Sequence, residues 1–151
     1  MPVKSVADLT VLADLERRLM ELRPDAIRRW GTLEPGEMLC HLGDACASVL
    51  ARPGGKPGQR RSLVRWIALY SPLPLPRGLT TLPQVDPRRD GTKPTDFEQD
   101  RARAIAGLRA VAAARPEALP AAHFAFGAMS AEDWYRWAYR HTDHHLRQFG
   151  V

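Results

Sequence analysis

The sequence predicts an all-α fold, a four-helix bundle with a short extra helix and a long Pro-rich loop. In four segments, apolar side chains recur at helical spacing between Pro- and Gly-rich breaks. Three of these segments open with Ser or Thr followed three residues later by Asp or Glu, which is typical of a helix N-terminus. Strand signals are weak. With 151 residues, of which 44% are hydrophobic, the chain is expected to form one domain over 1–151.

The first two long helices are predicted over residues 5–22 and 33–51. Pro24 ends the first, and Pro35 fits the opening turn of the second, where its missing N–H costs nothing. The predicted stripe of the first is Leu9, Leu12, Leu15, Leu19 and Leu22. The predicted core face of the second is Met38, His41, Leu42, Ala45 and Val49. The sequence therefore places His41 on a buried stripe.

The second half of the chain predicts a short apolar helix over 62–70 and long helices over 95–114 and from Ser130 onward. Between them, Ser71 to Pro94 is rich in Pro, Arg and Gly and has no periodicity. Loops of this length are uncommon inside a compact domain and are often functional. We expect this one to wrap the bundle or to cover a pocket.

Cysteine usage and charge limit the class of protein. Cys40 and Cys46 would lie roughly 9 Å apart on one helix, beyond the ~7 Å limit for a disulfide, so two buried thiols are expected. No secretory signal or membrane span is visible, so a cytoplasmic location is expected. The net charge of +5 is spread over separate arginine pairs rather than one stripe. We therefore expect binding neither to nucleic acid nor to a membrane.

The last helix carries the residues with the clearest chemistry. His141 and His145 are four residues apart, which places their Cβ atoms roughly 5–6 Å apart on one helix face. Two such imidazoles, with His41 from another helix, would hold one transition metal and leave a coordination position open. An open position distinguishes catalytic from structural sites, and zinc, nickel and iron all accept imidazole.

Neighbouring polar residues have alternative interpretations. A lone histidine on an apolar face, as His41 would be, is more often a hydrogen-bonded core residue than a ligand. His123 lies in a connector, where a structural or exposed role is the common one. His144 is expected beside the site or at the surface, and Gln148 is expected to hydrogen-bond a ligand or a bound water. Asp44, one turn beyond His41, is expected to orient its imidazole.

Two further expectations concern carboxylates. Asp143 lies off the stripe of the last helix and is predicted to face solvent. By sequence, Glu37 and Asp44 are the only carboxylates near His41, so no general base is assigned.

Three pieces of the chain resemble the DinB/YfiT-like superfamily of metalloenzymes. They are the segment from Trp30 to Asp44, the connector from His123 to Gly127, and the segment from Ser130 to Gln148 with its closing HxxHHxxQ pattern. The resemblance covers the chain from about Leu9 to its end. It implies a DinB-type bundle with a divalent metal, zinc or nickel above all and iron as a third choice, on His41, His141 and His145.

The resemblance also implies what such a site would do. Relatives include transferases that use bacillithiol, mycothiol or glutathione, and others that are hydrolase-like, and dimers are common among them. We therefore expect a metal that activates a small thiol or a water toward an electrophilic small molecule, in a homodimer. A non-catalytic helical dimer, with a structural metal or none, remains the alternative.

Overall fold

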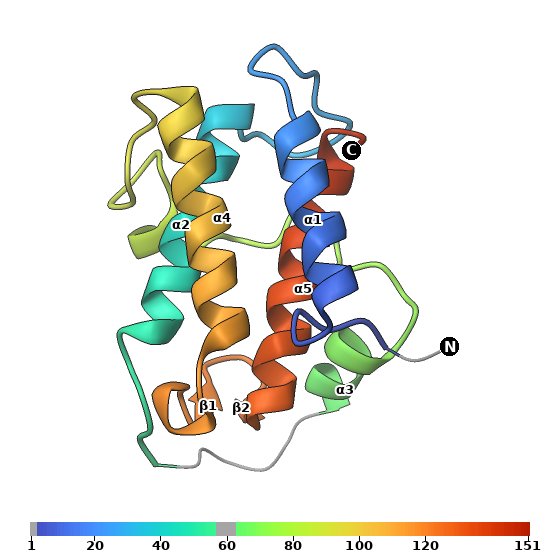
Figure 1. The fold of residues 1–151 in the computed structure, drawn as a ribbon, viewed down its shortest axis with the longest axis vertical. Coiled ribbons are helices and arrows are strands. Elements are labelled where there is room, and N and C mark those ends of the chain that lie inside the picture. Colours follow the sequence, from blue (N-terminus) through green and yellow to red (C-terminus); the bar gives the residue numbers. More distant parts are fainter. Residues whose placement is uncertain (1–2, 57–62) are drawn as a thin grey trace.

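The computed structural model describes residues 3–56 and 63–151, and in that part four long helices form a bundle (Figure 1). These helices are α1 (Leu9–Glu21), α2 (Pro35–Leu50), α4 (Phe97–Ala113) and α5 (Ala131–Gln148). The smaller elements are α3 (Leu63–Tyr70), the 3₁₀ turns η1 (Pro83–Val85) and η2 (Pro116–Ala118), and the antiparallel strands β1 (Ala122–His123) and β2 (Gly127–Ala128). The predicted all-α fold is confirmed. Within the described residues, no helix is long and apolar enough to cross a membrane.

Helix capping explains where the prediction succeeded and where it was shifted. At α5 the predicted capping box is present, because the side chains of Ser130 and Asp133 each accept from the other's backbone N–H. At α1 the cap is Asp8 rather than Ser5, and the helix begins at Leu9, four residues after the predicted start. Asp8 accepts from the backbone N–H of Thr10. At α4 the cap is likewise an aspartate, Asp96.

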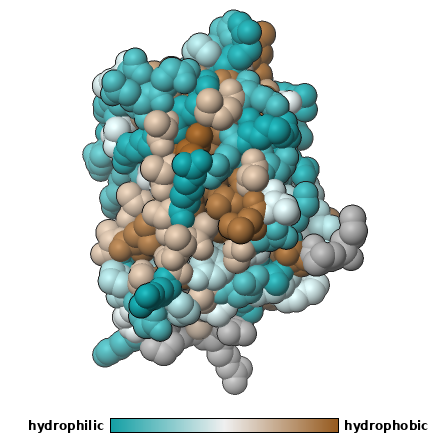
Figure 2. Space-filling model, in the orientation of Figure 1, coloured by the Kyte–Doolittle hydropathy of each residue, from teal (hydrophilic) through white to brown (hydrophobic). Residues whose placement is uncertain are grey.

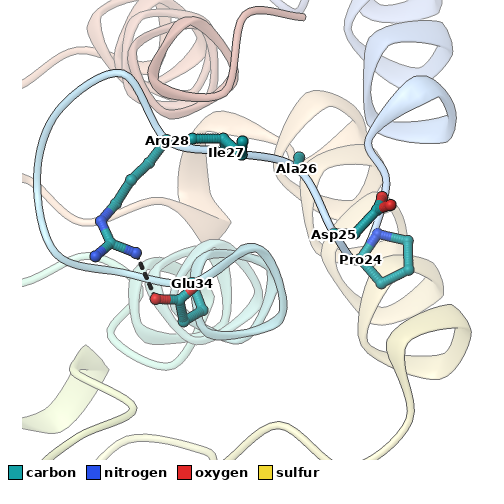
Figure 3. Close-up of a pocket in the computed structure, with 6 residues that line it drawn as sticks. All are labelled: Pro24, Asp25, Ala26, Ile27, Arg28 and Glu34. Carbon is teal, nitrogen blue, oxygen red and sulfur yellow. Dashed lines mark hydrogen bonds and ion pairs between the residues drawn. The ribbon is translucent and has the colours of Figure 1, made fainter.

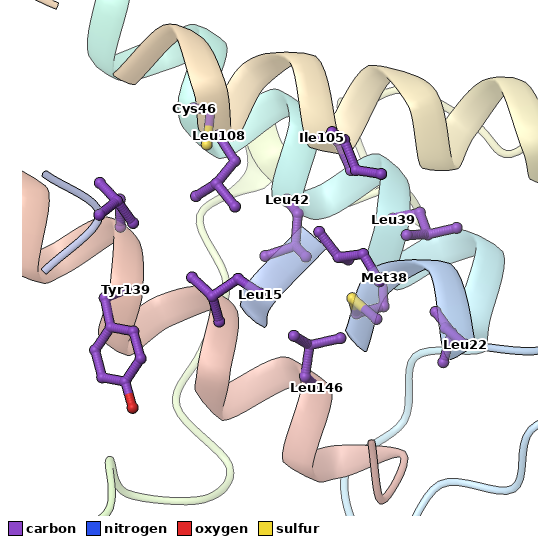
Figure 4. Close-up of a cluster of buried hydrophobic side chains, with 14 of the residues drawn as sticks. Leu15, Leu22, Met38, Leu39, Leu42, Cys46, Ile105, Leu108, Tyr139 and Leu146 are labelled. Carbon is purple, nitrogen blue, oxygen red and sulfur yellow. The ribbon is translucent and has the colours of Figure 1, made fainter. Parts of the chain in front are cut away.

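The core lies where the long helices converge (Figure 4). Leu15 of α1, Met38 of α2, Leu108 of α4 and Leu146 of α5 point toward a common centre and are at most 1% exposed. Burying a side chain of this size stabilises the fold by about 1.5–3 kcal/mol. Leu9 departs from the predicted stripe, being 78% exposed at the first position of its helix. Both cysteines are buried free thiols, as predicted.

The short helix α3 is held on α5 by polar contacts. The buried carboxylate of Asp133 accepts from Arg65 at 2.7 Å and from the Tyr70 hydroxyl at 2.5 Å. Arg140 of α5 donates through Nε to the carbonyl of Ala68 at 2.7 Å. The apolar residues Leu63, Val64, Trp66 and Ile67 of α3 are exposed instead. The apolar sequence predicted this helix correctly, but it did not indicate that an arginine would face inward.

The segment from Ser71 to Pro94 crosses the back of the bundle in Figure 1, from the α3 side to the α2 side. It is fastened along α2. Arg88 donates to both carboxylate oxygens of Glu37 and to the carbonyl of Thr32. The prediction that this loop wraps the bundle is therefore confirmed.

We expect Asp133→Ala to lower the free energy of unfolding by about 3 kcal/mol, because it removes the buried carboxylate that accepts from both Arg65 and Tyr70. Urea denaturation followed by circular dichroism measures this loss. Glu132→Ala is the matched control, since it removes only a half-exposed ion pair with Arg136 and should cost less than about 1 kcal/mol. Equal losses in the two variants would contradict the role given to Asp133.

Candidate metal centre

Three histidines from two helices meet at the candidate site. His41 comes from α2, and His141 and His145 come from successive turns of α5. One ligand nitrogen from each lies within 4.8 Å of the other two, and the Nε2 atoms of His41 and His141 are 3.0 Å apart. The ring centroids form a nearly equilateral triangle with sides of 4.8 to 4.9 Å. The predicted histidines are therefore brought together.

The tautomer of His41 is set by the long loop. Its Nδ1 lies 2.7 Å from the carbonyl oxygen of Val85 in η1. A carbonyl oxygen can only accept, so Nδ1 must carry the proton and Nε2 must carry the lone pair. The lone pair of His41 consequently faces the other two histidines.

The tautomer of His145 is set by a relay through Gln148. The Nε2 amide of Gln148 donates to the carbonyl of Trp30 at 2.8 Å, which fixes the orientation of the side-chain amide. Its Oε1 then accepts from Nδ1 of His145 at 3.1 Å. This leaves the lone pair of His145 on Nε2. Gln148 therefore lies beside the three histidines, and its partner there is an imidazole.

The relay requires a glycine next to Trp30. Gly31 has φ of +79°, and a Cβ at this position would lie 2.2 Å from Nε2 of Gln148. Any other residue would displace the amide that orients His145. The sequence contained the dipeptide Trp30-Gly31, but no local pattern predicted that it would meet the end of α5.

Aromatic packing holds His141. The Trp137 ring stacks on its imidazole with the centroids 5.0 Å apart and the planes at 17°. The two residues are one helical turn apart, so α5 itself provides the contact. His144 lies at the edge of the cluster, with its ring centroid 5.2 Å from that of His145 and 5.9 Å from that of Trp30. His144 is thus a neighbour of the cluster and is not one of the three residues whose ligand nitrogens converge.

Two predicted roles are wrong. Asp44 does not orient the imidazole of His41. Its carboxylate accepts instead from the backbone N–H and hydroxyl of Thr92 and from Arg103. The carbonyl of Val85 accepts from the His41 imidazole in its place. Asp143 does not face solvent. It is 6% exposed and accepts from Arg18 of α1 at 2.8 Å. The prediction failed because α5 packs on two sides and not only along its apolar stripe.

His123 lies apart from the three histidines. Its ring stacks on Phe124 and Phe126 in the β1–β2 hairpin, with centroid distances of 4.5 and 4.3 Å. Its Nδ1 accepts from the backbone N–H of Ala125 at 3.1 Å. The structure thus gives it the structural role that is common for a histidine in a connector.

The electrostatics of the cluster favour neutral imidazoles. Burial lowers the pKa of His41, lowers that of His141 well below its ordinary value, and lowers that of His145 to about 3. A proton on one ring would also repel a proton on the next, which lowers the pKa values of His141 and His145 further. Neutral imidazole is the form that binds a metal.

The donor set fits a divalent transition metal. The Nε2 lone pairs of His41 and His145 point into the cluster, where Nε2 of His141 lies 3.0 Å from Nε2 of His41. Zn–N bonds of about 2.0–2.1 Å in tetrahedral geometry place two ligand nitrogens roughly 3.3 Å apart. This separation exceeds the 3.0 Å between the Nε2 atoms of His41 and His141 and is less than the 4.8 Å within which all three ligand nitrogens lie. Small rotations of the rings would therefore suffice.

Two surface hollows lie away from the three histidines. One, of about 380 Å³, is lined by the connection after α1 and by Glu34 (Figure 3). Another, of about 310 Å³, is lined by Met20 of α1 and by α4 residues such as Ile105. Figure 2 shows apolar residues in the middle of the face where α1 and α4 lie side by side. Neither hollow includes a histidine, so the chemistry of the donor atoms, and not the size of a hollow, locates the site.

A comparison with protein-family models shows the family to which this chain belongs. The model of the DinB superfamily matches residues 25–149, a range that contains all three clustered histidines, Trp30 and Gln148. The chain belongs to the DinB superfamily. Neither a curated protein nor a solved structure matches it. Membership agrees with the resemblance found in the sequence and with the helical fold of this DinB-family protein.

We expect Gln148→Ala to weaken metal binding about 10- to 100-fold, because the imidazole of His145 loses the acceptor that fixes its tautomer. Competition against a fluorescent zinc chelator measures the affinity. The control is Arg147→Ala, which changes an exposed neighbour on the same turn. A Gln148→Ala protein with the affinity of the parent would show that the relay does not tune the site.

We expect the metal-free protein to lose stability as the pH falls from about 6.5 toward 3. In the unfolded chain a histidine binds a proton near pH 6.5, whereas folded His145 stays neutral down to a pKa of about 3. The unfolded state thus binds more protons in this window, and stability rises with pH there. Urea midpoints at pH 7.5, 6 and 5 measure the slope. His145→Gln should make it shallower, and an unchanged slope in that variant would contradict the assignment.

Proposed function

We propose that this DinB-family protein is a metal-dependent enzyme in which His41, His141 and His145 hold one divalent metal. Zinc and nickel are the favoured ions and iron is the third. The observation that carries the proposal is the convergence of three imidazoles, two of which have their Nε2 lone pairs fixed toward the cluster by hydrogen bonds at Nδ1. Such outer hydrogen bonds are typical of metal-bound histidine. Membership in a metal-binding family supports the same conclusion.

The proposed reaction is transfer of a small thiol to an electrophile, or hydrolysis of one. When bound, the metal would act as a Lewis acid and lower the pKa of a thiol or water in its open position. The chain supplies positioning. Val85 and Gln148 orient two ligands, and Trp137 covers one face of His141. The side chains of His141 and His145 are each partly exposed, whereas His41 is 4% exposed.

Glu37 and Asp44, the two carboxylates near His41 in the sequence, are both engaged by other groups. Glu37 is bound by Arg88, which holds the pKa of that carboxyl below its usual value. Asp44 is engaged by Thr92 and Arg103. Activation of the nucleophile is therefore assigned to the metal in this proposal.

The alternative is a non-catalytic homodimer in which a metal is structural. Exposed apolar side chains on α3, including Leu63 and Trp66, favour association of two copies, because clustered apolar residues on a surface often mark interaction sites. We propose a cytoplasmic homodimer for either reading. Many arginines form ion pairs with neighbouring carboxylates, as Arg17 and Arg109 do, so their charge is partly neutralised. This supports a small molecule rather than nucleic acid as the partner.

The first test is metal content. Protein purified without chelator or affinity metal should carry about one zinc, nickel or iron per chain by mass spectrometry, since one three-histidine site holds one ion. His41→Ala and His145→Ala should lose it, because each removes a ligand. His123→Ala, which removes a histidine outside the cluster, should keep it. A parent protein that stays metal-free even after supplementation would overturn the proposal.

Chelation separates the enzyme from the structural alternative. For an enzyme we expect helicity by circular dichroism to persist without metal, because the core is formed by leucines of all four long helices and not by the site. Thiol-transfer or hydrolytic activity should disappear and return with added metal. Loss of the fold together with the metal would instead favour the structural dimer.

A further inference from the structure

Two arginines beside the histidine cluster have no carboxylate partner among the residues that the structure describes. Arg77, on the long loop, lies with its guanidinium carbon 4.2 Å from the ring centroid of Trp30. Arg140, on α5, donates to the carbonyls of Ala68 and Leu73. By contrast, Arg18 and Arg147 of the neighbouring helix surface both pair with Asp143.

Trp30 connects this cationic edge to the metal centre. Its carbonyl holds Gln148, its ring lies 5.9 Å from that of His144, and Arg77 stacks on its face. The indole N–H of Trp30 is buried and has no acceptor within the described part of the chain. A buried donor without a partner is unfavourable and is commonly satisfied by a ligand or a water.

The carboxylate and the arginine nearest the cluster differ in whether their charge is balanced. Asp44 on α2 is engaged by Thr92 and Arg103. Arg77 lies against the ring of Trp30, which neighbours the ring of His144. An anion that reaches Trp30 would therefore meet a cation that no carboxylate of the described residues neutralises.

We propose that the substrate carries an acidic group, a carboxylate or a phosphate, which Arg77 binds beside Trp30 while the reactive end of the substrate reaches the metal. A planar guanidinium binds two oxygens of such a group at once. Stacking on an aromatic ring presents the guanidinium already oriented, so less conformational freedom is lost on binding. The indole N–H of Trp30 would supply a further donor. Only the placement of the reactive end rests on the proposed function.

The test measures anion binding by metal-free protein, so its outcome does not depend on the metal proposal. The indole N–H resonance of Trp30, identified with Trp30→Phe, is followed by ¹H–¹⁵N NMR during titration with inorganic phosphate, succinate and the neutral analogue succinamide. We expect a saturable shift with phosphate or succinate and none with succinamide. The tighter of the two anions identifies the chemistry of the acidic group.

Matched variants assign the binding to Arg77. Arg77→Gln should weaken binding about tenfold or more, because a charge-assisted contact is lost. Arg77→Lys, which keeps the charge but not the planar fork, should bind with intermediate affinity. Arg89→Gln removes an equal charge from the same exposed loop and should bind as the parent does. Equal weakening by Arg77→Gln and Arg89→Gln, or an unmoved Trp30 resonance, would overturn the proposal. Failure of the metal proposal alone would leave these results unchanged.

Discussion

The structure of the candidate site depends on two hydrogen bonds, one donated by Nδ1 of His41 and one donated by Nδ1 of His145. A neutral imidazole carries one proton, and whichever nitrogen donates outward leaves the other free to coordinate. The carbonyl of Val85 accepts a hydrogen bond from Nδ1 of His41, and the amide oxygen of Gln148 accepts one from Nδ1 of His145. Without them, each ring would be free to turn its N–H inward. These contacts convert two histidines that are merely close together into a set of ligand atoms that face one another.

Both acceptors depend on segments outside the two helices that carry the histidines. Val85 lies in the loop after α3, and Gln148 is oriented by the carbonyl of Trp30 before α2. The loop is fastened to α2 by Arg88 on Glu37 and by Thr92 on Asp44. Asp44 thus supports His41 indirectly, by holding the segment whose carbonyl orients its ring. The irregular parts of the chain determine the chemistry of the site, while the bundle determines its position.

The same segments carry the cationic edge proposed to bind substrate. Arg77 belongs to the loop that supplies Val85, and it stacks on the tryptophan whose carbonyl fixes Gln148. Movement of this loop would therefore change the substrate contact and the orientation of the ligands together. The core would be unaffected, because none of the buried residues in its main cluster comes from this loop. This separation agrees with a site that can be altered without loss of the fold.

The sequence by itself determined the helices, the buried stripe that contains His41, and the pairing of His141 with His145, because these follow from periodicity within one segment. It also determined the family, through the segments around Trp30 and the closing histidines. It did not determine the partner of His41, the need for Gly31 or the burial of Asp143 and Asp133. Each of those depends on a contact between residues distant in the chain, such as the 2.7 Å contact from His41 to Val85 or the 2.8 Å ion pair from Arg18 to Asp143. Spacing along one helix fixes which residues share a face, and only the packed structure decides which group lies opposite that face.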